Sequence, residues 1–464
     1  MTVAKHVILT ALLAASTLAS QAAEENKANI GGHSLDGRPE IAVFPQHQPR
    51  CIGDVAHGYG VVCLLRKHIP EARIRVLKFF HEAREMYGRH FQDVKGVGHD
   101  WLDTSDLLIT SSGPVWLGLD YMRQWVAEAG GKPFGTYGVT GGSLGYLGAE
   151  EADAIRKSSF LYFRDTKSLE MFKDLNPELQ TRIPEIGFVP DGVFGFTLLD
   201  DEKALQFLAE KGLKEREYLC VVMRLRRTPP GLRLENGLSG PYTVESSQTM
   251  DYFVGDVKHT MKWHNLSSLE ETMEYNRKYM EADHAPIREA ITIFVRKTGM
   301  KVLLCPEMTY HLDAMGPLLR DPLPEDVKSK VVIRDTWWLP DEAASVYKRA
   351  FALLSLDCHS PIIASVHETP VFVYYFTPDS PKYQMWEDIG LGDWSGPVAD
   401  TTGARIAEKL LAIHEDYDMA KKKMRTVMDG VRHRHWETMN YIRGLVNLPP
   451  TESRFRESAE TKQQ

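Results

Sequence analysis

The sequence predicts an α/β protein built from two Rossmann-like, doubly wound domains that face a cleft. The chain has 464 residues, which is more than one hydrophobic core usually accommodates. Short apolar segments of strand length alternate with helical segments roughly every 25 to 30 residues, as in parallel sheets with crossover helices. Polar residues recur directly after the apolar segments, and open α/β sheets bind ligands at the carboxyl ends of their strands.

Composition excludes several classes of function. The chain is 43% hydrophobic and 25% charged, as in ordinary soluble globular proteins. Its formal net charge of -8 argues against a general nucleic-acid surface, and no nucleic-acid partner is expected. The five cysteines include no C-x-x-C pair, so we expect no zinc site. No other metal and no cofactor are expected either. Cys51 and Cys63 could pair in an exported protein or could equally stay reduced.

The N-terminus has the pattern of a secretory signal peptide. An apolar run at 7–15 follows Lys5, and Ser20 and Ala22 place small residues where a signal peptidase reads. We predict a signal peptide at 1–22, export to the periplasm or outside the cell, and a flexible lead-in at 23–38. The alternatives are an uncleaved anchor or a misassigned start. No later stretch holds about 20 uninterrupted apolar residues, so we expect no transmembrane segment in the mature chain.

Residues 39–200 are predicted to form the N-terminal domain. Its strands are predicted at 41–44, 74–77, 106–110, 132–139 and 160–163, and a segment at 189–194 ends the domain. The first helix begins after Gly53-Asp54 and ends near Lys67. Its start could hold a ligand against backbone N–H groups, or Asp54 could only cap the helix.

Two further strand ends of this domain carry polar residues. Ser111 and Ser112 follow the strand at 106–110, and small residues there allow a ligand or backbone to come close. Arg164 and Asp165 follow the strand at 160–163. They are candidate ligand contacts, with an internal ion pair as the alternative.

Residues 201–450 are predicted to form the C-terminal domain. Its strands are predicted at 218–223, 301–305, 331–334, 352–356 and 370–376, and its helices at 201–211, 268–298, after 340, from 360, at 403–416 and at 418–446. Residues 228–266 are rich in Pro, Gly and polar residues and are predicted to be an inserted, irregular loop. Residues 451–464 form a polar tail.

Charged side chains gather at the strand ends of the C-terminal domain. The candidates are Arg224, Arg226, Glu307, His359 and Lys382. Arginine, lysine and histidine together suit a small anion such as a phosphate or carboxylate, and a histidine among them can act as a general acid or base. Glu307 is a candidate contact to an acceptor sugar. No G-x-S-x-G, H-E-x-x-H or acidic metal cluster supports a serine hydrolase or a zinc protease.

Four stretches, in this order, resemble the polysaccharide pyruvyl transferase family. They are Gly53-Asp54 before the first helix, Arg164-Asp165-Thr166-Lys167-Ser168, Val189-Pro190-Asp191, and the block from Ala352 to Tyr375 that contains His359. The likeness spans roughly residues 50 to 415. It implies two Rossmann-like domains of the glycosyltransferase B type.

The resemblance also implies a reaction. Members of this family transfer a pyruvyl group from phosphoenolpyruvate to a sugar, here expected to belong to a cell-envelope glycan. By the same resemblance His359 is the acid/base or phosphate-contacting residue, Arg224 contacts the donor, and Lys382 lies where members often have a lysine. Protonation of the enol needs an acid, and the phosphate and carboxylate of the donor need cations.

The chain departs from the family pattern at the centre of its last motif. The family's R-L-H is here Asp357-Cys358-His359, and its G-T-P is Glu368-Thr369-Pro370. An acid in place of an arginine would repel an anionic donor, unless Arg226 or Arg227 substitutes for it. An exported protein would also lack access to cytoplasmic phosphoenolpyruvate. The alternatives are therefore a glycan-binding or catalytically lapsed relative, or a nucleotide-sugar glycosyltransferase of the same fold.

Overall fold

A computed structural model describes most of the chain. The described residues are 37–45, 51–77, 83–111, 113, 118–141, 148–228, 249–254, 257–262, 269–377 and 381–452. The predicted signal peptide, the residue Ser112 and most of the predicted polar tail lie outside these ranges. None of the described helices has the length and hydropathy needed to cross a membrane.

The N-terminal half is a seven-stranded parallel sheet with the order β3-β2-β1-β4-β5-β6-β7. Its strands are β1 (Glu40–Phe44), β2 (Arg73–Val76), β3 (Lys95–Gly96), β4 (Leu107–Thr110), β5 (Phe134–Val139), β6 (Phe160–Phe163) and β7 (Glu185–Phe188). Its helices are α2 (Ile52–His68), α3 (Arg84–His90), α4 (Trp101–Thr104), α5 (Leu119–Glu128), α6 (Ala149–Arg156) and α7 (Thr166–Leu175), with 3-10 turns η2 (Pro177–Thr181) and η3 (Gly192–Gly195). The order reverses between β1 and β4, which is the switch point where doubly wound sheets bind ligands.

The C-terminal half repeats this arrangement in a six-stranded parallel sheet with the order β12-β11-β8-β13-β14-β15. Its strands are β8 (Tyr218–Val222), β11 (Lys301–Leu304), β12 (Val331–Ile333), β13 (Ala352–Ser355), β14 (Val371–Tyr375) and β15 (Ser395–Pro397). Its larger helices are α8 (Asp201–Glu210), α9 (Leu269–Thr298), α12 (Pro340–Lys348), α13 (His359–Val366), α15 (Gly403–Glu415) and α16 (Tyr417–Leu445). Shorter helical segments are α10 (His311–Met315), η4 (Gly316–Arg320), α11 (Glu325–Lys328), η5 (Pro381–Tyr383), α14 (Gln384–Asp388), η6 (Gly392–Trp394) and η7 (Val398–Asp400).

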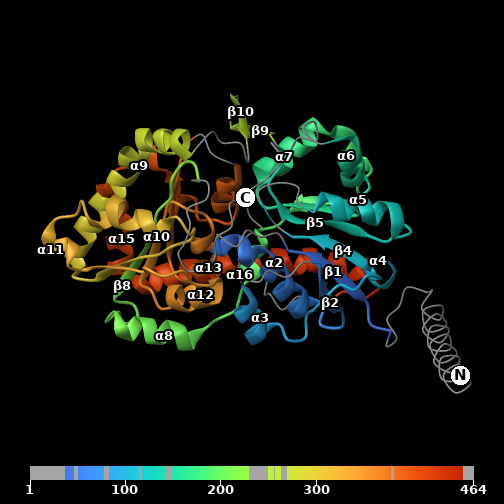
Figure 1. The fold of residues 1–464 in the computed structure, drawn as a ribbon, viewed down its shortest axis with the longest axis horizontal. Coiled ribbons are helices and arrows are strands. Elements are labelled where there is room, and N and C mark those ends of the chain that lie inside the picture. Colours follow the sequence, from blue (N-terminus) through green and yellow to red (C-terminus); the bar gives the residue numbers. More distant parts are fainter. Residues whose placement is uncertain are drawn as a thin grey trace, which may run out of the picture.

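The two halves meet around α2 and α13, as Figure 1 shows near the centre of the molecule. The last helix, α16, begins in the C-terminal half and packs against α2. Near its end Arg443 forms an ion pair with Glu71, at 2.8 Å between Nη1 and Oε2. In the same helix His435 Nδ1 lies 2.8 Å from the Tyr137 hydroxyl of β5. The chain therefore crosses between the halves twice, once before α8 and once in α16.

The predicted irregular loop at 228–266 contains a pair of strands. β9 (Thr249–Val254) and β10 (Val257–Lys262) pair in antiparallel fashion, so the prediction of an irregular segment was wrong for these residues. The run Tyr252-Phe253-Val254 is aromatic and β-branched, which favours a strand. Three short strands at sheet edges, β3, β7 and β15, were not predicted from the sequence.

A buried carboxylate joins the two halves at α12. Asp341 accepts hydrogen bonds from Arg89 Nη2, at 2.7 Å, and from His90 Nε2, at 3.1 Å, across the interface. Burial raises the pKa of Asp341, but the bonds from His90 and Arg89 outweigh it and hold that pKa below its usual value. A carboxylate with a lowered pKa contributes stability above its ordinary pKa and loses it as the pH falls through the folded value.

The variant Asp341→Asn is therefore expected to lower the free energy of unfolding by roughly 1–3 kcal/mol at pH 7. The difference from the parent should shrink as the pH falls below about 4. Denaturant unfolding across a pH series measures both effects. Asp326→Asn is the control, because the pair of Asp326 with Arg296 is exposed on both sides, and this substitution should change stability much less than Asp341→Asn does. Equal effects of the two substitutions would contradict the assignment.

Candidate functional site at the interface of the two halves

The site is built where the N-terminal ends of α2 and α13 meet. His359 is the first residue of α13, at the carboxyl end of β13. Its ring lies against Gly53 of α2, where a Cβ atom would stand 2.1 Å from His359 Cγ. Only glycine permits this approach. The Gly53-Asp54 pair thus makes room for a side chain from the other half, and no side-chain cap of α2 by Asp54 is seen.

Glu307 fixes His359 from the end of β11. Its Oε1 accepts a hydrogen bond from the His359 backbone N–H at 3.1 Å, and its Oε2 accepts from the Ser360 N–H at 2.7 Å. A carboxylate at this position satisfies two backbone donors at the start of α13 and faces the positive end of its dipole. The same Oε1 lies 3.1 Å from His359 Nδ1. Glu307 therefore holds both the helix end and the ring.

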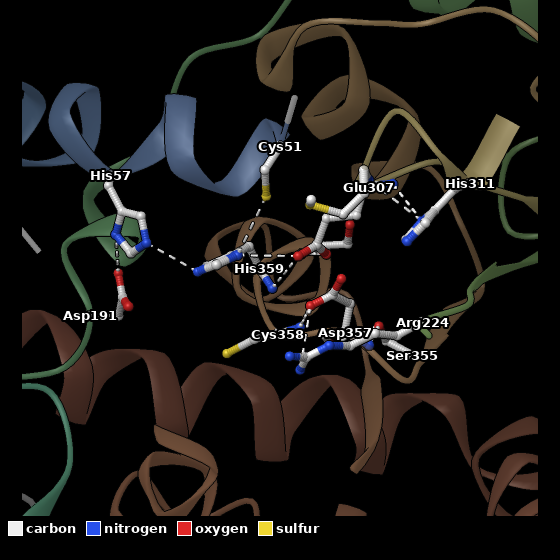
Figure 2. A network of polar contacts seen from close by, with 12 residues as sticks. Cys51, His57, Asp191, Arg224, Glu307, His311, Ser355, Asp357, Cys358 and His359 are labelled. Carbon is white, nitrogen blue, oxygen red and sulfur yellow. Dashed lines mark hydrogen bonds and ion pairs between the residues drawn. The ribbon is translucent and has the colours of Figure 1, made fainter. Parts of the chain in front are cut away.

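A chain of buried polar side chains continues from His359 into the N-terminal half (Figure 2). His359 Nε2 lies 3.0 Å from Nε2 of His57, which comes from α2. His57 Nδ1 lies 3.1 Å from Asp191 Oδ1, and both side chains are fully buried. Asp191 Oδ2 accepts a hydrogen bond from Arg164 Nη1 at 2.7 Å. Glu307, His359, His57, Asp191 and Arg164 thus form one chain of contacts across the interface, which we call the interface relay.

The interface relay constrains the protons on its two imidazoles. Each ring presents Nδ1 to a carboxylate and Nε2 to the other ring. A neutral imidazole carries one N–H, whereas these three contacts need three protons if each is a hydrogen bond. The two imidazoles together therefore carry one extra proton, unless one of the Nδ1 contacts is not a hydrogen bond.

The titratable groups in and around the relay have pKa values that are shifted in different directions. Burial raises the pKa of Asp191, but the facing His57 and Arg164 outweigh it and hold that pKa well below its usual range. Burial lowers the pKa of His359 well below its usual value, and the charge of His57 adds to this effect. Burial raises the pKa of Asp54 to about 6, partly opposed by His57. Strongly shifted groups gathered in one place are typical of functional sites.

Cationic side chains line the C-terminal side of the site. Arg224, directly after β8, donates to the Tyr383 hydroxyl, and its Nη1 lies 3.9 Å from Asp357 Oδ1. Lys382 of η5 is buried, and its positive charge acts on Asp54 and on His359. Asp357 is thus partnered by Arg224. The charge of Lys382 thus acts on His359, and the Arg224–Asp357 pair stands at the end of β13, two residues before His359.

Other predicted residues have structural partners instead. Arg226 makes a two-point pair with Asp283, with 2.7 Å for each bond, and lies over the ring of Tyr279. Asp165 caps α7 by accepting from the Ser168 N–H at 2.6 Å. The expected internal pairing of Arg164 is found, but its partner is Asp191 rather than Asp165. Neither Arg226 nor Asp165 contacts His359 in the described part of the chain, and Ser112 lies outside it.

The sequence analysis did not single out His57 or Cys51 as site residues. His57 lies four residues after Gly53, so both fall on one face of α2. Cys51 precedes the helix, and its Sγ lies 4.0 Å from His359 Nδ1. This spacing of Gly53 and His57 was the available signal, but nothing in the sequence shows that β13 ends opposite that face.

Two sets of three residues place possible metal ligands close together. In each set, one ligand atom per residue lies within 4.8 Å of the others. The sets are Cys51, Asp54 and His359, and His57, Asp191 and His359. In the second set, His57 already contacts both Asp191 and His359. In the first, the Asp54 carboxylate accepts no hydrogen bond from the described residues, and the five cysteines of the chain, Cys51 included, are free thiols.

A cavity of about 560 Å³ lies elsewhere on the interface. It is lined by Phe188 and Pro190, by the end of α14 and by residues of α16 such as Met419 and Arg434. None of the predicted site residues lines it. The cavity and the interface relay are therefore separate features. The shifted pKa values in the relay favour it over the cavity as the candidate for chemistry.

Comparisons with known proteins define the fold and leave the family open. No protein-family model matches the chain, and no curated protein matches it. Among solved structures, a UDP-N-acetylglucosamine 2-epimerase from Listeria monocytogenes is similar with a TM-score of 0.52 and 9% identity, over 90% of this chain and 99% of that one. The S. aureus MnaA–UDP structure has a TM-score of 0.49 and 10% identity, over 89% and 99% of the two chains. The E. coli ADP-heptose lps heptosyltransferase II has a TM-score of 0.46 and 12% identity, over 82% and 99%.

The likeness to the Listeria structure, together with the two parallel sheets, confirms the predicted fold class. The chain has two Rossmann-like domains in the glycosyltransferase B arrangement. At such low identity the likeness concerns the fold alone, and the reaction has to be argued from the site.

The close approach at Gly53 generates a stability prediction. Gly53→Ala places a methyl group on the His359 ring and is expected to lower the free energy of unfolding by about 1–3 kcal/mol. Gly430→Ala in α16 is the matched control, because its Cβ meets nothing within 4 Å. There the substitution should raise stability by about 0.5–1 kcal/mol. Denaturant unfolding measures both, and stabilisation by Gly53→Ala would contradict the packing described.

Proposed function

We propose that the chain is a transferase that acts on a nucleotide sugar, with the reaction at the interface relay. The observation that supports this most is the meeting of His359, two cations and the partly exposed Asp54 at one place between two Rossmann-like domains. The Listeria structure of the same fold carries the name of an enzyme of nucleotide sugars. A site of this kind would work through positioning and electrostatics.

Arg224 and Lys382 are proposed to bind the phosphate of the donor. Guanidinium and ammonium groups stabilise negative charge that develops on a leaving phosphate. Arg224 is already oriented by the Tyr383 hydroxyl and by Asp357, so its position in the site is fixed before a donor binds. The pairing supports a positioning role for Asp357. The acid holds the arginine instead of simply repelling the donor.

His359 and Asp54 are proposed to handle the proton of the acceptor hydroxyl. Activation of a hydroxyl needs a base within hydrogen-bond reach. Asp54 is partly exposed and has a pKa raised to about 6 by burial, a value suited to exchanging protons near neutral pH. His57, Asp191 and Glu307 would then act as positioning residues that hold His359.

A second candidate is pyruvyl transfer from phosphoenolpyruvate to a glycan. It is favoured by one specific observation. Gly53, Arg164, Asp191 and His359, one from each of the four motifs that resemble the pyruvyl transferase family, all lie in or against the interface relay. The two candidates share a phosphate-bearing donor and differ in its remaining part.

Binding experiments separate the two candidates. Calorimetry of the purified protein with UDP, ADP and phosphoenolpyruvate should show binding of a nucleoside diphosphate under the first proposal. Binding of phosphoenolpyruvate alone would contradict the first proposal and favour pyruvyl transfer. Binding of neither would remove both.

The variants Arg224→Gln and His359→Ala test the assigned roles. Arg224→Gln removes a charged hydrogen-bond donor and is expected to weaken binding of the preferred donor by roughly 10- to 100-fold. His359→Ala is expected to reduce turnover by at least about 100-fold. Arg296→Gln is the control, since Arg296 is exposed and paired only on the surface. An unchanged donor affinity in Arg224→Gln would contradict its assignment.

A further inference from the structure

Three side chains near His359 Nδ1 carry metal-ligating atoms. Cys51 Sγ lies 4.0 Å from this nitrogen, and Glu307 Oε1 lies 3.1 Å from it. Asp54 completes a set with Cys51 and His359 whose ligand atoms all lie within 4.8 Å of one another. Ligands of a tetrahedral zinc ion are separated by about 3.3–3.8 Å, as follows from bond lengths near 2.0–2.3 Å. Movements of less than about 1 Å would therefore bring the ligand atoms of Cys51, Asp54 and His359 into one coordination sphere.

We propose that Cys51, Asp54 and His359 form a binding site for a divalent transition-metal ion of the zinc type, with Glu307 as a further carboxylate beside His359 Nδ1. The donor set contains one thiolate, one imidazole nitrogen and carboxylate oxygens, a mixture that zinc accepts and that magnesium or calcium does not favour. Binding requires Cys51 to lose its thiol proton to solvent. The Nδ1 proton of His359, where present, leaves in the same way.

Hydrogen bonding along the interface relay supports this site independently. With a metal on His359 Nδ1, the ring carries its single proton on Nε2 and donates it to His57 Nε2, at 3.0 Å. His57 then carries its proton on Nδ1 and donates to Asp191, at 3.1 Å. Both imidazoles are then neutral, and the two protons serve the His359–His57 and His57–Asp191 contacts, so no third proton is needed on the rings.

The relay then has the form of an outer shell of a metal site. Histidine ligands usually donate their second ring N–H to an oriented acceptor, which fixes the tautomer and the ring. Here that acceptor is His57, held in turn by Asp191 and Arg164. Glu307 is also oriented, because it accepts from the N–H groups of His359 and Ser360.

The proposed metal would join the two halves of the chain. Cys51 and Asp54 belong to the N-terminal half, and Glu307 and His359 belong to the C-terminal half. A backbone hydrogen bond from Ile52 N–H to the Glu307 carbonyl oxygen, 2.9 Å long, already brings the two pairs together. The inference does not depend on the donor proposed above. If that proposal holds, the metal would occupy Asp54 and His359 and so compete with proton transfer.

Cobalt(II) provides a direct spectroscopic probe of this site. Full-length protein is treated with a chelator, desalted and titrated with Co²⁺. We expect one equivalent to bind with a thiolate-to-cobalt charge-transfer band in the near ultraviolet, which Zn²⁺ then abolishes by displacement. Zn²⁺ should also raise the Tm of the protein, because it binds the folded chain across the interface.

Matched variants locate the ligands. Cys51→Ser should lose the charge-transfer band, whereas Cys63→Ser, later on the same helix, should keep it. Asp54→Asn changes a partly exposed side chain and should weaken Co²⁺ binding by at least about 10-fold with the fold intact by circular dichroism. No charge-transfer band in the parent protein, or a band that persists in Cys51→Ser, would overturn the proposal. Neither outcome bears on binding of UDP or phosphoenolpyruvate.

Discussion

The contact between His57 and His359 is the interaction around which the two halves are arranged. It joins α2 of the first sheet to α13 of the second, and both rings are buried. Buried imidazoles need partners for both nitrogens. The second nitrogen of His57 contacts Asp191, and that of His359 contacts Glu307. Asp191 in turn neutralises the buried Arg164. Through this one contact, Arg164 at the end of β6 is connected to Glu307 at the end of β11.

The close packing of α2 against its neighbours depends on the glycines of this helix. Added Cβ atoms would clash with the His359 ring at Gly53, with Pro45 at Gly58 and with the Gly192 carbonyl oxygen at Gly60. Glycine in a helix interior lowers helix stability by roughly 0.5–1 kcal/mol relative to alanine, so these positions are explained by packing rather than by helix propensity. The same close packing keeps α2 buried on most of its surface, and it places the start of the helix beside the strand ends of the other half.

Sequence reasoning predicted the repeated β-α order well, because alternating apolar and amphipathic segments encode it locally. It also predicted His359, Arg224, Lys382, Glu307 and Asp54 as candidates, since each follows a strand or begins a helix. What it could not predict is which strand ends face one another. Arg226 and Asp165 satisfied the same rule, yet the fold gives them Asp283 and the α7 terminus as partners. The edge strands β3, β7 and β15 were missed because they are short, with no long apolar run.

The central claim is that His57 and His359 form one coupled unit across the interface, and a double-mutant cycle tests it most directly. The free energies of unfolding of His57→Ala, His359→Ala and the double variant would be compared with that of the parent chain. A shared hydrogen bond predicts that the double variant departs from the sum of the single effects by roughly 1–3 kcal/mol. Additivity within about 0.5 kcal/mol would contradict the coupling and, with it, the interface relay as the organising feature of the site.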